Sequence, residues 1–130
     1  MPASSPGPRP GASLQTIAMP ADTNANGDIF GGWLMGQMDL GASVLARGLA
    51  QGRVATVAVD AMRFHHPVKV GDVVSIFPSM DKLGRTSMTL HVEVRTFNAE
   101  TGEEKQAAEC RIVFVAIDHG GRPRPLPPQH

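Results

Sequence analysis

The hydrophobic period of this chain changes once, and that change constrains the fold more than any other feature. Between residues 33 and 52 the sequence reads WLMGQMDLGASVLARGLAQG, and apolar residues recur at steps of three and four, as on one face of a helix. From about residue 54 they alternate at a step of two, which is typical of half-buried strands. We therefore predict one long helix followed by strands. The buried face of the helix is predicted to contain Leu34, Met38, Ala42, Leu45 and Leu49.

Four glycines occur in and just after the helical pattern. Gly48 and Gly52 are stop signals, which place the end of the helix near them. Gly36 and Gly41 lie inside the helix, where each glycine costs roughly 1 kcal/mol relative to alanine. We expect a close approach of the helix backbone to a sheet to offset that cost.

Five strands are predicted, at about residues 14–19, 54–62, 73–80, 88–95 and 105–117. Short turns join the last four, and consecutive strands joined by tight turns form an antiparallel sheet. Pro78 indicates an edge or a bulge in the 73–80 strand. In the 54–62 strand, the alternation places Val57 and Val59 on one face and Thr56 on the other. One helix covers one face of such a sheet, so we predict an α+β domain whose strand after the helix is an edge that favours self-association.

Composition separates a folded domain from two tails. Residues 1–13 (MPASSPGPRPGAS) are predicted to be a flexible N-terminal tail, and residues 119–130 (HGGRPRPLPPQH) a Pro-rich C-terminal tail that lies extended on the surface. The folded domain is predicted at 14–118. Lys plus Arg equals Asp plus Glu at 12 each, so no global basic field indicates nucleic acid or an anionic membrane as a partner. Any phosphate-binding site must therefore be local.

Cysteine usage and the N-terminal residues favour a cytoplasmic protein. The single cysteine, Cys110, excludes an intrachain disulfide and is predicted to be a buried, small apolar residue. Residues 1–13 lack the apolar centre of a secretory signal. No apolar run approaches the roughly 18 residues that a membrane-spanning helix needs.

Four blocks of the sequence carry a family resemblance. AMPADTNANGDIFGGWLMGQMDLGAS, GRVATVAVDAMRFHHPVKVGDVV, LGRTSMTLHVEV and FVAIDHGGRPRPLP resemble the signature of YciA-type acyl-CoA thioesterases, a branch of the hotdog superfamily. The likeness covers about residues 14–127. It implies the hotdog fold, in which a curved antiparallel sheet wraps one long helix. It also implies hydrolysis of acyl-CoA to a free acid and coenzyme A without a metal or redox cofactor, and a homodimer that assembles as a trimer of dimers.

Three residues in or before the helix are candidates for the chemistry. Spacing alone makes Asp39 an ordinary solvated helix carboxylate, but the resemblance implies a general base or nucleophile beside the thioester at the dimer interface. Asn24 is by itself a turn former, and the resemblance implies that it reaches across the dimer to orient water or substrate. Gly32 lies where helix amides are unpaired, so we predict that its amide forms an oxyanion hole.

The phosphorylated nucleotide of coenzyme A requires cations or aimed amides. Arg53, Arg122 and Arg124 are candidates, although each alone is usually a solvated surface charge. The resemblance favours the turn at 84–87 as a coenzyme A contact. The residues of that turn are Gly84, Arg85, Thr86 and Ser87. For the acyl chain, Phe64 with Val57 and Met62 is a candidate wall, and core packing explains the same residues equally well.

Two other functions remain open at this point. A hotdog dehydratase uses a histidine with a carboxylate near the helix, and residues 21–47 contain no histidine. A non-catalytic acyl-CoA or nucleotide sensor would keep the binding site without turnover, and release of free thiol from acyl-CoA separates it from an enzyme. His65 and His66 depart from the family pattern and on a strand would point opposite ways. No second cluster of ligands accompanies them to form a metal site, and the Gly-x-Ser-x-Gly motif of serine hydrolases is absent.

Overall fold

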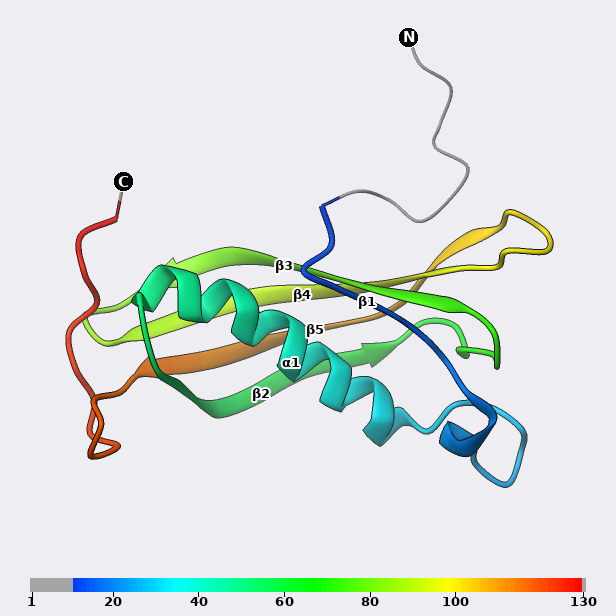
Figure 1. The fold of residues 1–130 in the computed structure, drawn as a ribbon, viewed down its shortest axis with the longest axis horizontal. Helices are drawn as coiled ribbons and strands as arrows, with labels where there is room; N and C mark the ends of the chain where they lie inside the picture. Colours follow the sequence, from blue (N-terminus) through cyan, green and yellow to red (C-terminus); the bar gives the residue numbers. More distant parts are fainter. Residues whose placement is uncertain (1–10, 130) are drawn as a thin grey trace, which may run out of the picture.

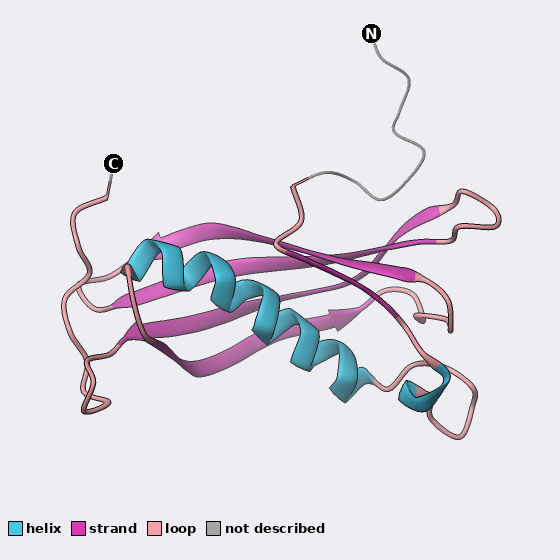
Figure 2. Ribbon diagram, in the orientation of Figure 1, coloured by secondary structure: helices cyan, strands magenta, loops and turns pink. Residues whose placement is uncertain are grey.

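The computed structural model describes residues 11–129, in which one long helix lies across one face of a five-stranded sheet (Figure 1). All strand pairs are antiparallel, in the order β1-β3-β4-β5-β2. Figure 2 shows the helix and the sheet as two layers. The predicted α+β arrangement is confirmed. The elements are β1 (Leu14–Ile17), the short 3-10 helix η1 (Pro20–Asp22), α1 (Gly31–Ala50), β2 (Val54–Phe64), β3 (Val73–Leu83), β4 (Ser87–Phe97) and β5 (Glu104–Ala116).

The core lies between α1 and the sheet. Leu34, Met38 and Ala42 are buried as predicted, whereas Leu45 and Leu49 are only partly buried. Small residues, Ala46 and Ala50, occupy the fully buried positions in the last turns instead. On the sheet side of the core, β4 shows a regular alternation. Its buried residues, Met88, Leu90, Val92 and Val94, alternate strictly with residues of the outer face. No helix within residues 11–129 combines the length and apolar character needed to cross a membrane.

Gly41 is the point of closest approach between α1 and β3. A Cβ atom on Gly41 would lie 2.6 Å from Cγ2 of Ile76, which is closer than real Cβ contacts come. The expected close approach is therefore confirmed at Gly41. Gly36 has open space around it within residues 11–129, so packing inside this part of the chain does not explain that glycine. The helix passes Gly48 and ends at Ala50, where Gln51 takes the left-handed conformation with φ of 51°.

The two edges of the sheet differ in regularity. β1 pairs only with residues 73–76 of β3, so Pro78 lies on a free edge, as predicted. A bulge follows between Met80 and Lys82. β2, at the other edge, has register shifts between Thr56 and Ala58 and between Asp60 and Arg63. These shifts interrupt the simple alternation that the sequence predicted for this strand.

Both chain ends of the described part contact the domain. Residues 1–10 of the predicted N-terminal tail lie outside the described residues, but Ser13 already donates from its backbone N–H to the Ile76 carbonyl and from its hydroxyl to the Gly41 carbonyl, both within 2.9 Å. The C-terminal residues run along the end of α1 near the sheet (Figure 1). Their contacts are described below, because they bear on the 84–87 turn.

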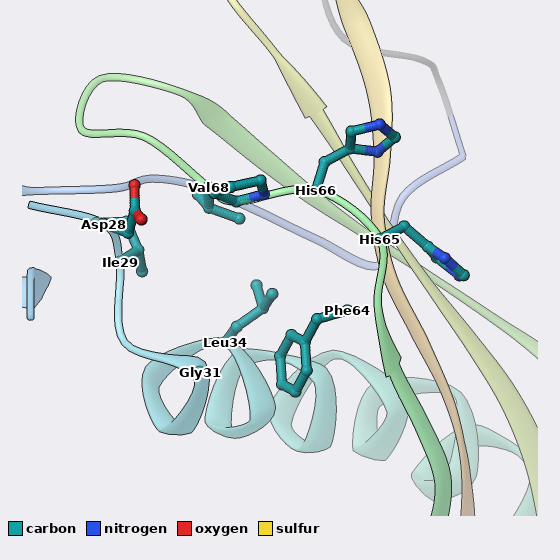
Figure 3. Close-up of a pocket in the computed structure, with 9 residues that line it drawn as sticks. Asp28, Ile29, Gly31, Leu34, Phe64, His65, His66 and Val68 are labelled. Carbon is teal, nitrogen blue, oxygen red and sulfur yellow. The ribbon is translucent and has the colours of Figure 1, made fainter. Parts of the chain in front are cut away.

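The histidine pair lies just beyond the end of β2. Because β2 ends at Phe64, strand alternation does not apply to His65 and His66, and the backbone N–H groups of both donate to the Ala107 carbonyl, at 2.8 Å and 3.2 Å. The expectation that they point opposite ways assumed a strand, and both residues lie beyond it. The His65 ring hydrogen-bonds to the Glu109 side chain and the His66 ring to the Gln106 carbonyl, both on β5. Figure 3 shows the rings turned away from Leu34 and Phe64.

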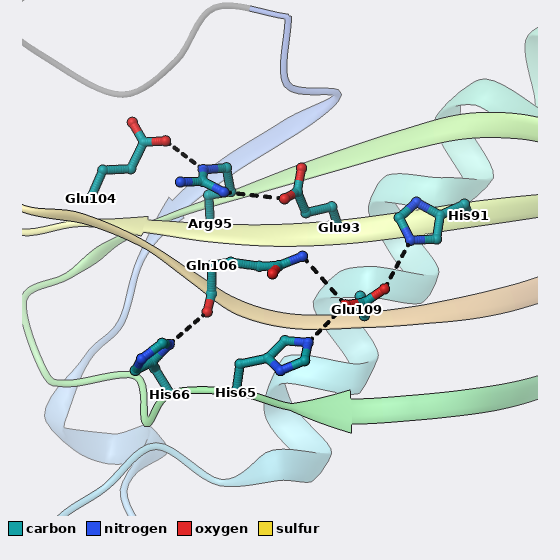
Figure 4. Close-up of polar contacts among 8 residues, drawn as sticks. All are labelled: His65, His66, His91, Glu93, Arg95, Glu104, Gln106 and Glu109. Carbon is teal, nitrogen blue, oxygen red and sulfur yellow. Dashed lines mark hydrogen bonds and ion pairs between the residues drawn. The ribbon is translucent and has the colours of Figure 1, made fainter.

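Glu109 joins two histidines on the outer face of the sheet. Its carboxylate lies 2.7 Å from Nε2 of His65 and 3.2 Å from Nε2 of His91 (Figure 4). The hydrogen bonds from His65 and His91 lower the pKa of the Glu109 carboxyl. Nearby, Arg95 is paired with Glu93 and Glu104. Within residues 11–129, no group of His, Cys, Asp or Glu side chains is arranged to hold a metal ion.

Gly41→Ala should destabilise the fold relative to a matched glycine substitution. Gly48→Ala is the control, because Gly48 lies in the same helix with open space around it. Both substitutions gain the same helix propensity, so the difference isolates the clash with Ile76. Overpacking of this kind costs about 1–3 kcal/mol. Urea unfolding should therefore show Gly41→Ala less stable than Gly48→Ala by that amount, and equal stability would contradict the close packing at Gly41.

Glu109→Gln should change how stability depends on pH. A carboxyl whose pKa is lowered on folding stabilises the protein above its unfolded value, here ordinarily 4.5, and that contribution is lost as the pH falls through the lowered folded pKa. The wild type should therefore lose more stability on acidification below about pH 4.5 than Glu109→Gln does. Glu100→Gln, in an exposed loop, is the control. Parallel stability profiles for the wild type and Glu109→Gln would disprove this role.

Candidate functional site

Asp39 lies in the third turn of α1, half-buried, beside the edge strand β2. The hydroxyl of Thr56 donates to its Oδ1 atom at 2.7 Å. This bond fixes the orientation of the carboxylate and leaves Oδ2 available to another donor. The structure thus places Asp39 at an accessible position with a defined polar partner.

Thr56 was missed by sequence reasoning, which placed it on the face opposite to Val57 and Val59. In the structure Thr56 pairs with Phe114, a buried residue of β5, and residues paired across two strands share a face. The register then shifts at Val57, so that Ala58 pairs with Val113. Thr56 therefore faces the helix, and the bulge after it brings Val59, which pairs with the buried Ile112, to the same face. The alternating sequence of β2 contains no signal for that bulge.

Cys110 lies on the inner face of β5 and is buried, as predicted. Burial, together with the nearby negative charges of Asp60 and Asp39, raises the pKa of its thiol to about 11. The thiol therefore stays protonated near neutral pH and is not a nucleophile.

The first turn of α1 presents uncapped amides. Phe30 is the N-cap residue and gives no side-chain hydrogen bond, and the first turn contains no acidic residue. The first amides of a helix have no partner within it. Gly32 has no atom within 4 Å of its Cβ direction, so a ligand can approach its backbone within the described part of the chain. The N–H of Gly32 can thus donate a hydrogen bond to an atom that carries negative charge, as the donors of an oxyanion hole do.

A pocket of about 310 Å³ opens beside this turn (Figure 3). Its apolar walls come from Ile29, Leu34, Phe64 and Val68. The Phe64 ring lies over Gly31, where an added Cβ would be 3.3 Å from the ring, and 53% of Phe64 remains exposed. Phe64 therefore lines a surface pocket and is not a core residue, which fits the predicted acyl wall better than the core-packing alternative.

The side chain of Asn24 is hydrogen-bonded within its own loop. Its side-chain oxygen accepts hydrogen bonds from the backbone N–H groups of Asn26 and Asp28, at 2.8 Å and 3.2 Å. Asp28 in turn is paired with Lys69. Asn24 lies before α1 and Asp39 lies in its third turn, and within residues 11–129 no hydrogen bond joins the two.

The predicted coenzyme A residues gather at the end of the sheet next to the C-terminus of α1. The backbone of β5 makes this connection, because the Ala116 N–H donates to Thr86 and the Ile117 N–H donates to Arg53. Arg53 also donates from its guanidinium to the carbonyls of Asp118 and His119, at 3.2 Å and 3.0 Å. The two predicted regions, Arg53 and the 84–87 turn, therefore flank the same strand end.

The 84–87 turn itself is tight and exposed. The Gly84 N–H donates to the Ser87 carbonyl at 2.8 Å, and a Cβ on Gly84 would lie 2.6 Å from the Ser87 hydroxyl, so a larger residue there would have to displace that side chain. Arg85 is exposed, and its guanidinium has no hydrogen-bond or ion-pair partner within residues 11–129. Arg124 differs from Arg85, because its partly buried guanidinium donates to the carbonyls of Ile117 and Ala50.

Within one chain these groups lie at three separate positions along α1. A helix rises about 1.5 Å per residue, so Gly32 and Asp39 are roughly 10 Å apart along its axis, and Asp39 and Ala50 roughly 17 Å apart. A single carbonyl group cannot contact both Gly32 and Asp39 of one chain. The structure thus brings Phe64 to the Gly32 end and Arg53 to the 84–87 turn, with Asp39 between them.

Comparison with known proteins identifies the family. Residues 26–103 match the family model of the Thioesterase superfamily. The chain is similar to the acyl-CoA thioester hydrolase YciA of Salmonella typhimurium, with 51% identity over 119 residues that cover 89% of this chain and 90% of the relative. Among solved structures it is similar to a hexameric thioesterase of Yersinia pestis, with a TM-score of 0.87 and 50% identity, covering 94% of this chain and 99% of the other.

A second similar structure is a hexameric, broad-specificity acyl-coenzyme A thioesterase crystallised as an aspartate-to-alanine mutant. It has a TM-score of 0.89 and 46% identity, covering 91% of this chain and 87% of the other. The resemblance first seen in the four sequence blocks is therefore confirmed over nearly the whole domain. The chain belongs to the Thioesterase superfamily, and within it to the YciA-type acyl-CoA thioester hydrolases of the hotdog fold.

Proposed function

We propose that the chain hydrolyses acyl-CoA thioesters to a free carboxylic acid and coenzyme A. The observation that carries this proposal is the Asp39 carboxylate, held on one oxygen by Thr56 at 2.7 Å and accessible on the helix surface. Its family membership supports the reaction class. The determination of an aspartate-to-alanine mutant structure for a similar thioesterase supports an aspartate as the residue to test.

In this reaction Asp39 acts as a general base or as a nucleophile. As a base it takes a proton from water while the water oxygen adds to the carbonyl carbon, and the carbon–sulfur bond then breaks as the thiolate of coenzyme A leaves and is protonated. As a nucleophile it displaces the thiolate and forms a mixed anhydride, which water hydrolyses. In both routes the carbonyl oxygen gains negative charge, and the Gly32 amide stabilises it. Water, a carboxylate and amides supply each step, so the chemistry needs no metal or redox cofactor.

The geometry supports an active site shared between two copies of the chain. Gly32 and Asp39 of one chain are too far apart for one thioester, so the Asp39 of one copy acts with the Gly32 and Asn24 of another. The exposed edge strand supplies the contact surface, since Val57 and Val59 are 57% and 41% exposed at this edge. We propose a homodimer paired through β2, assembled as a trimer of dimers like the hexameric structures to which the chain is similar.

We propose that the substrate extends from the 84–87 turn, past Asp39, to the pocket beside Phe64. The phosphorylated nucleotide of coenzyme A contacts the 84–87 turn and Arg53, where guanidinium groups are exposed. The acyl chain enters the pocket lined by Phe64 and Leu34. The free Cys110 fits a reducing compartment such as the cytoplasm.

Asp39→Asn should remove most of the turnover while leaving the fold intact. The replacement is nearly isosteric and keeps an oxygen that can accept from Thr56, but it can neither take a proton nor attack carbon. Loss of a general base typically lowers the rate about 10²–10⁴-fold. Thiol release from acyl-CoA, followed with a thiol reagent, should show this fall in kcat with a nearly unchanged KM.

Two further variants provide rates with which the rate of Asp39→Asn can be compared. Thr56→Val and Asn24→Ala should give smaller losses, because these residues orient a reacting group without exchanging its proton. An Asp39→Asn protein with the wild-type oligomer size and melting temperature that still hydrolyses acyl-CoA near the wild-type rate would disprove the mechanism. Asp28 would then be the next carboxylate to test.

A mixing experiment tests whether the site is shared between chains. Gly32→Pro removes one amide donor in the first helical turn, where proline is tolerated. Co-refolding it with Asp39→Asn should restore about a quarter of wild-type activity, because random pairing makes half of the dimers mixed and each mixed dimer has one intact site. Neither variant alone should show this activity. A mixture that stays inactive although mixed dimers form, or a wild type that sediments as a monomer at micromolar concentration, would rule out the shared site.

A further inference from the structure

The residues after β5 turn back and bind three parts of the domain. Asp118 organises the reversal, since its side chain accepts from the N–H groups of Gly120 and Arg122, both at 2.9 Å. The returning chain then pairs with the end of β5, where the Arg124 N–H donates to the Ala116 carbonyl at 2.9 Å. Figure 1 shows this segment beside the C-terminal end of α1. We call residues 117–129 the C-terminal strap.

Arg124 holds the strap against the helix. Its guanidinium donates from Nη2 to the Ala50 carbonyl at 2.8 Å and from Nε to the Ile117 carbonyl at 3.1 Å. The last carbonyls of a helix have no partner within it and carry partial negative charge, so a cation is favoured there. The absence of a side chain at Gly52 makes room, because a Cβ there would lie 2.8 Å from Nη2 of Arg124. The charge of Arg124 therefore joins the helix end to the strap.

The strap also holds the 84–87 turn. The Leu126 N–H donates to the Arg85 carbonyl at 2.9 Å, and the Leu126 side chain packs against the core. On the other side of the turn, the Ala116 N–H donates to the Thr86 carbonyl at 2.9 Å. The turn is thus attached to β5 through one bond and to the strap through the other. The exposed guanidinium of Arg85 has no hydrogen-bond or ion-pair partner among the described residues, so its position depends on its backbone.

We propose that Arg124 is a positioning residue for the coenzyme A moiety of the substrate. It fixes the strap on α1, the strap fixes the backbone of Arg85 through Leu126, and Arg85 meets the phosphorylated nucleotide. This inference rests on the proposed function, because it assigns a nucleotide contact to Arg85. It predicts that Arg124 acts on substrate binding without touching the substrate and without affecting the thioester chemistry at Asp39.

Steady-state kinetics with two substrates test this role. One substrate is an acyl-CoA, and the other is the same acyl group on pantetheine, which lacks the nucleotide. Arg85→Ala should raise KM for acyl-CoA roughly 10-fold to 100-fold, the range for one lost charge-assisted contact. Arg124→Met should raise it roughly 3-fold to 10-fold, with kcat within about 2-fold of the wild type. Neither variant should change the kinetics with acyl-pantetheine.

Four comparisons separate positioning from a purely structural or purely electrostatic role. Leu126→Pro removes the N–H that bonds to Arg85 without changing charge, and it should reproduce the rise in KM. Arg124→Lys should recover part of the wild-type KM, because an ammonium can still donate to one carbonyl. Lys105→Met removes one positive charge at the opposite end of β5 and should leave KM unchanged. In the Arg85→Ala background, Arg124→Met should add nothing further to KM.

An unchanged KM in both Arg124→Met and Leu126→Pro would overturn the positioning role, as would a rise in KM that persists in the Arg85→Ala background. A wild type that releases thiol from neither substrate would instead refute the proposed hydrolysis. Calorimetric titration with coenzyme A then tests the strap independently, because Arg124→Met should weaken coenzyme A binding and leave pantetheine binding unaffected. A wild type that does not bind coenzyme A would overturn both proposals.

Discussion

The close packing of α1 on the sheet is the constraint on which the rest of the structure depends. Gly41 lets the helix backbone approach Ile76 on β3, and small side chains in the later turns keep the helix near the strands along its length. A helix lying this close presents its third turn to β2, so that the short side chain of Thr56 reaches Asp39. A helix further from the sheet would require a longer side chain to hold that carboxylate.

The sequence predicted the architecture well because each element has its own period. The helical period of residues 33–52 and the alternation of the later strands follow directly from burial on one side, and β4 shows that alternation without interruption. The irregularities were not predictable from the same signal. The bulge at Val57 brings Thr56 and Val59 to the same face of β2, and beyond the end of β2 at Phe64 both His65 and His66 hydrogen-bond to β5. Both depend on pairing with β5, which is distant in the sequence.

Site residues were predictable to different degrees. Uncapped amides at Gly32 follow from local sequence, since a glycine at a helix start with no capping side chain leaves its N–H groups open. The importance of Asp39 came from the family resemblance, because its spacing alone indicates a solvated helix carboxylate. Arg124 illustrates the opposite case. From sequence it was one of several exposed cations, and only the return of the chain after Asp118 brings its guanidinium onto the end of α1.

The helix is also the reason for proposing an active site shared between two copies of the chain. A helix is rigid and has a fixed rise per residue. Along α1 the unpaired amides of the first turn, the Asp39 carboxylate and the last-turn carbonyls that bind Arg124 are therefore held at fixed separations. No movement within the helix can bring the first two together. A second copy related by two-fold symmetry and paired at β2 runs antiparallel to the first, so its first turn can approach the middle of the other helix. The same exposed edge that needs a partner for its backbone hydrogen bonds therefore lies where a partner would complete the site.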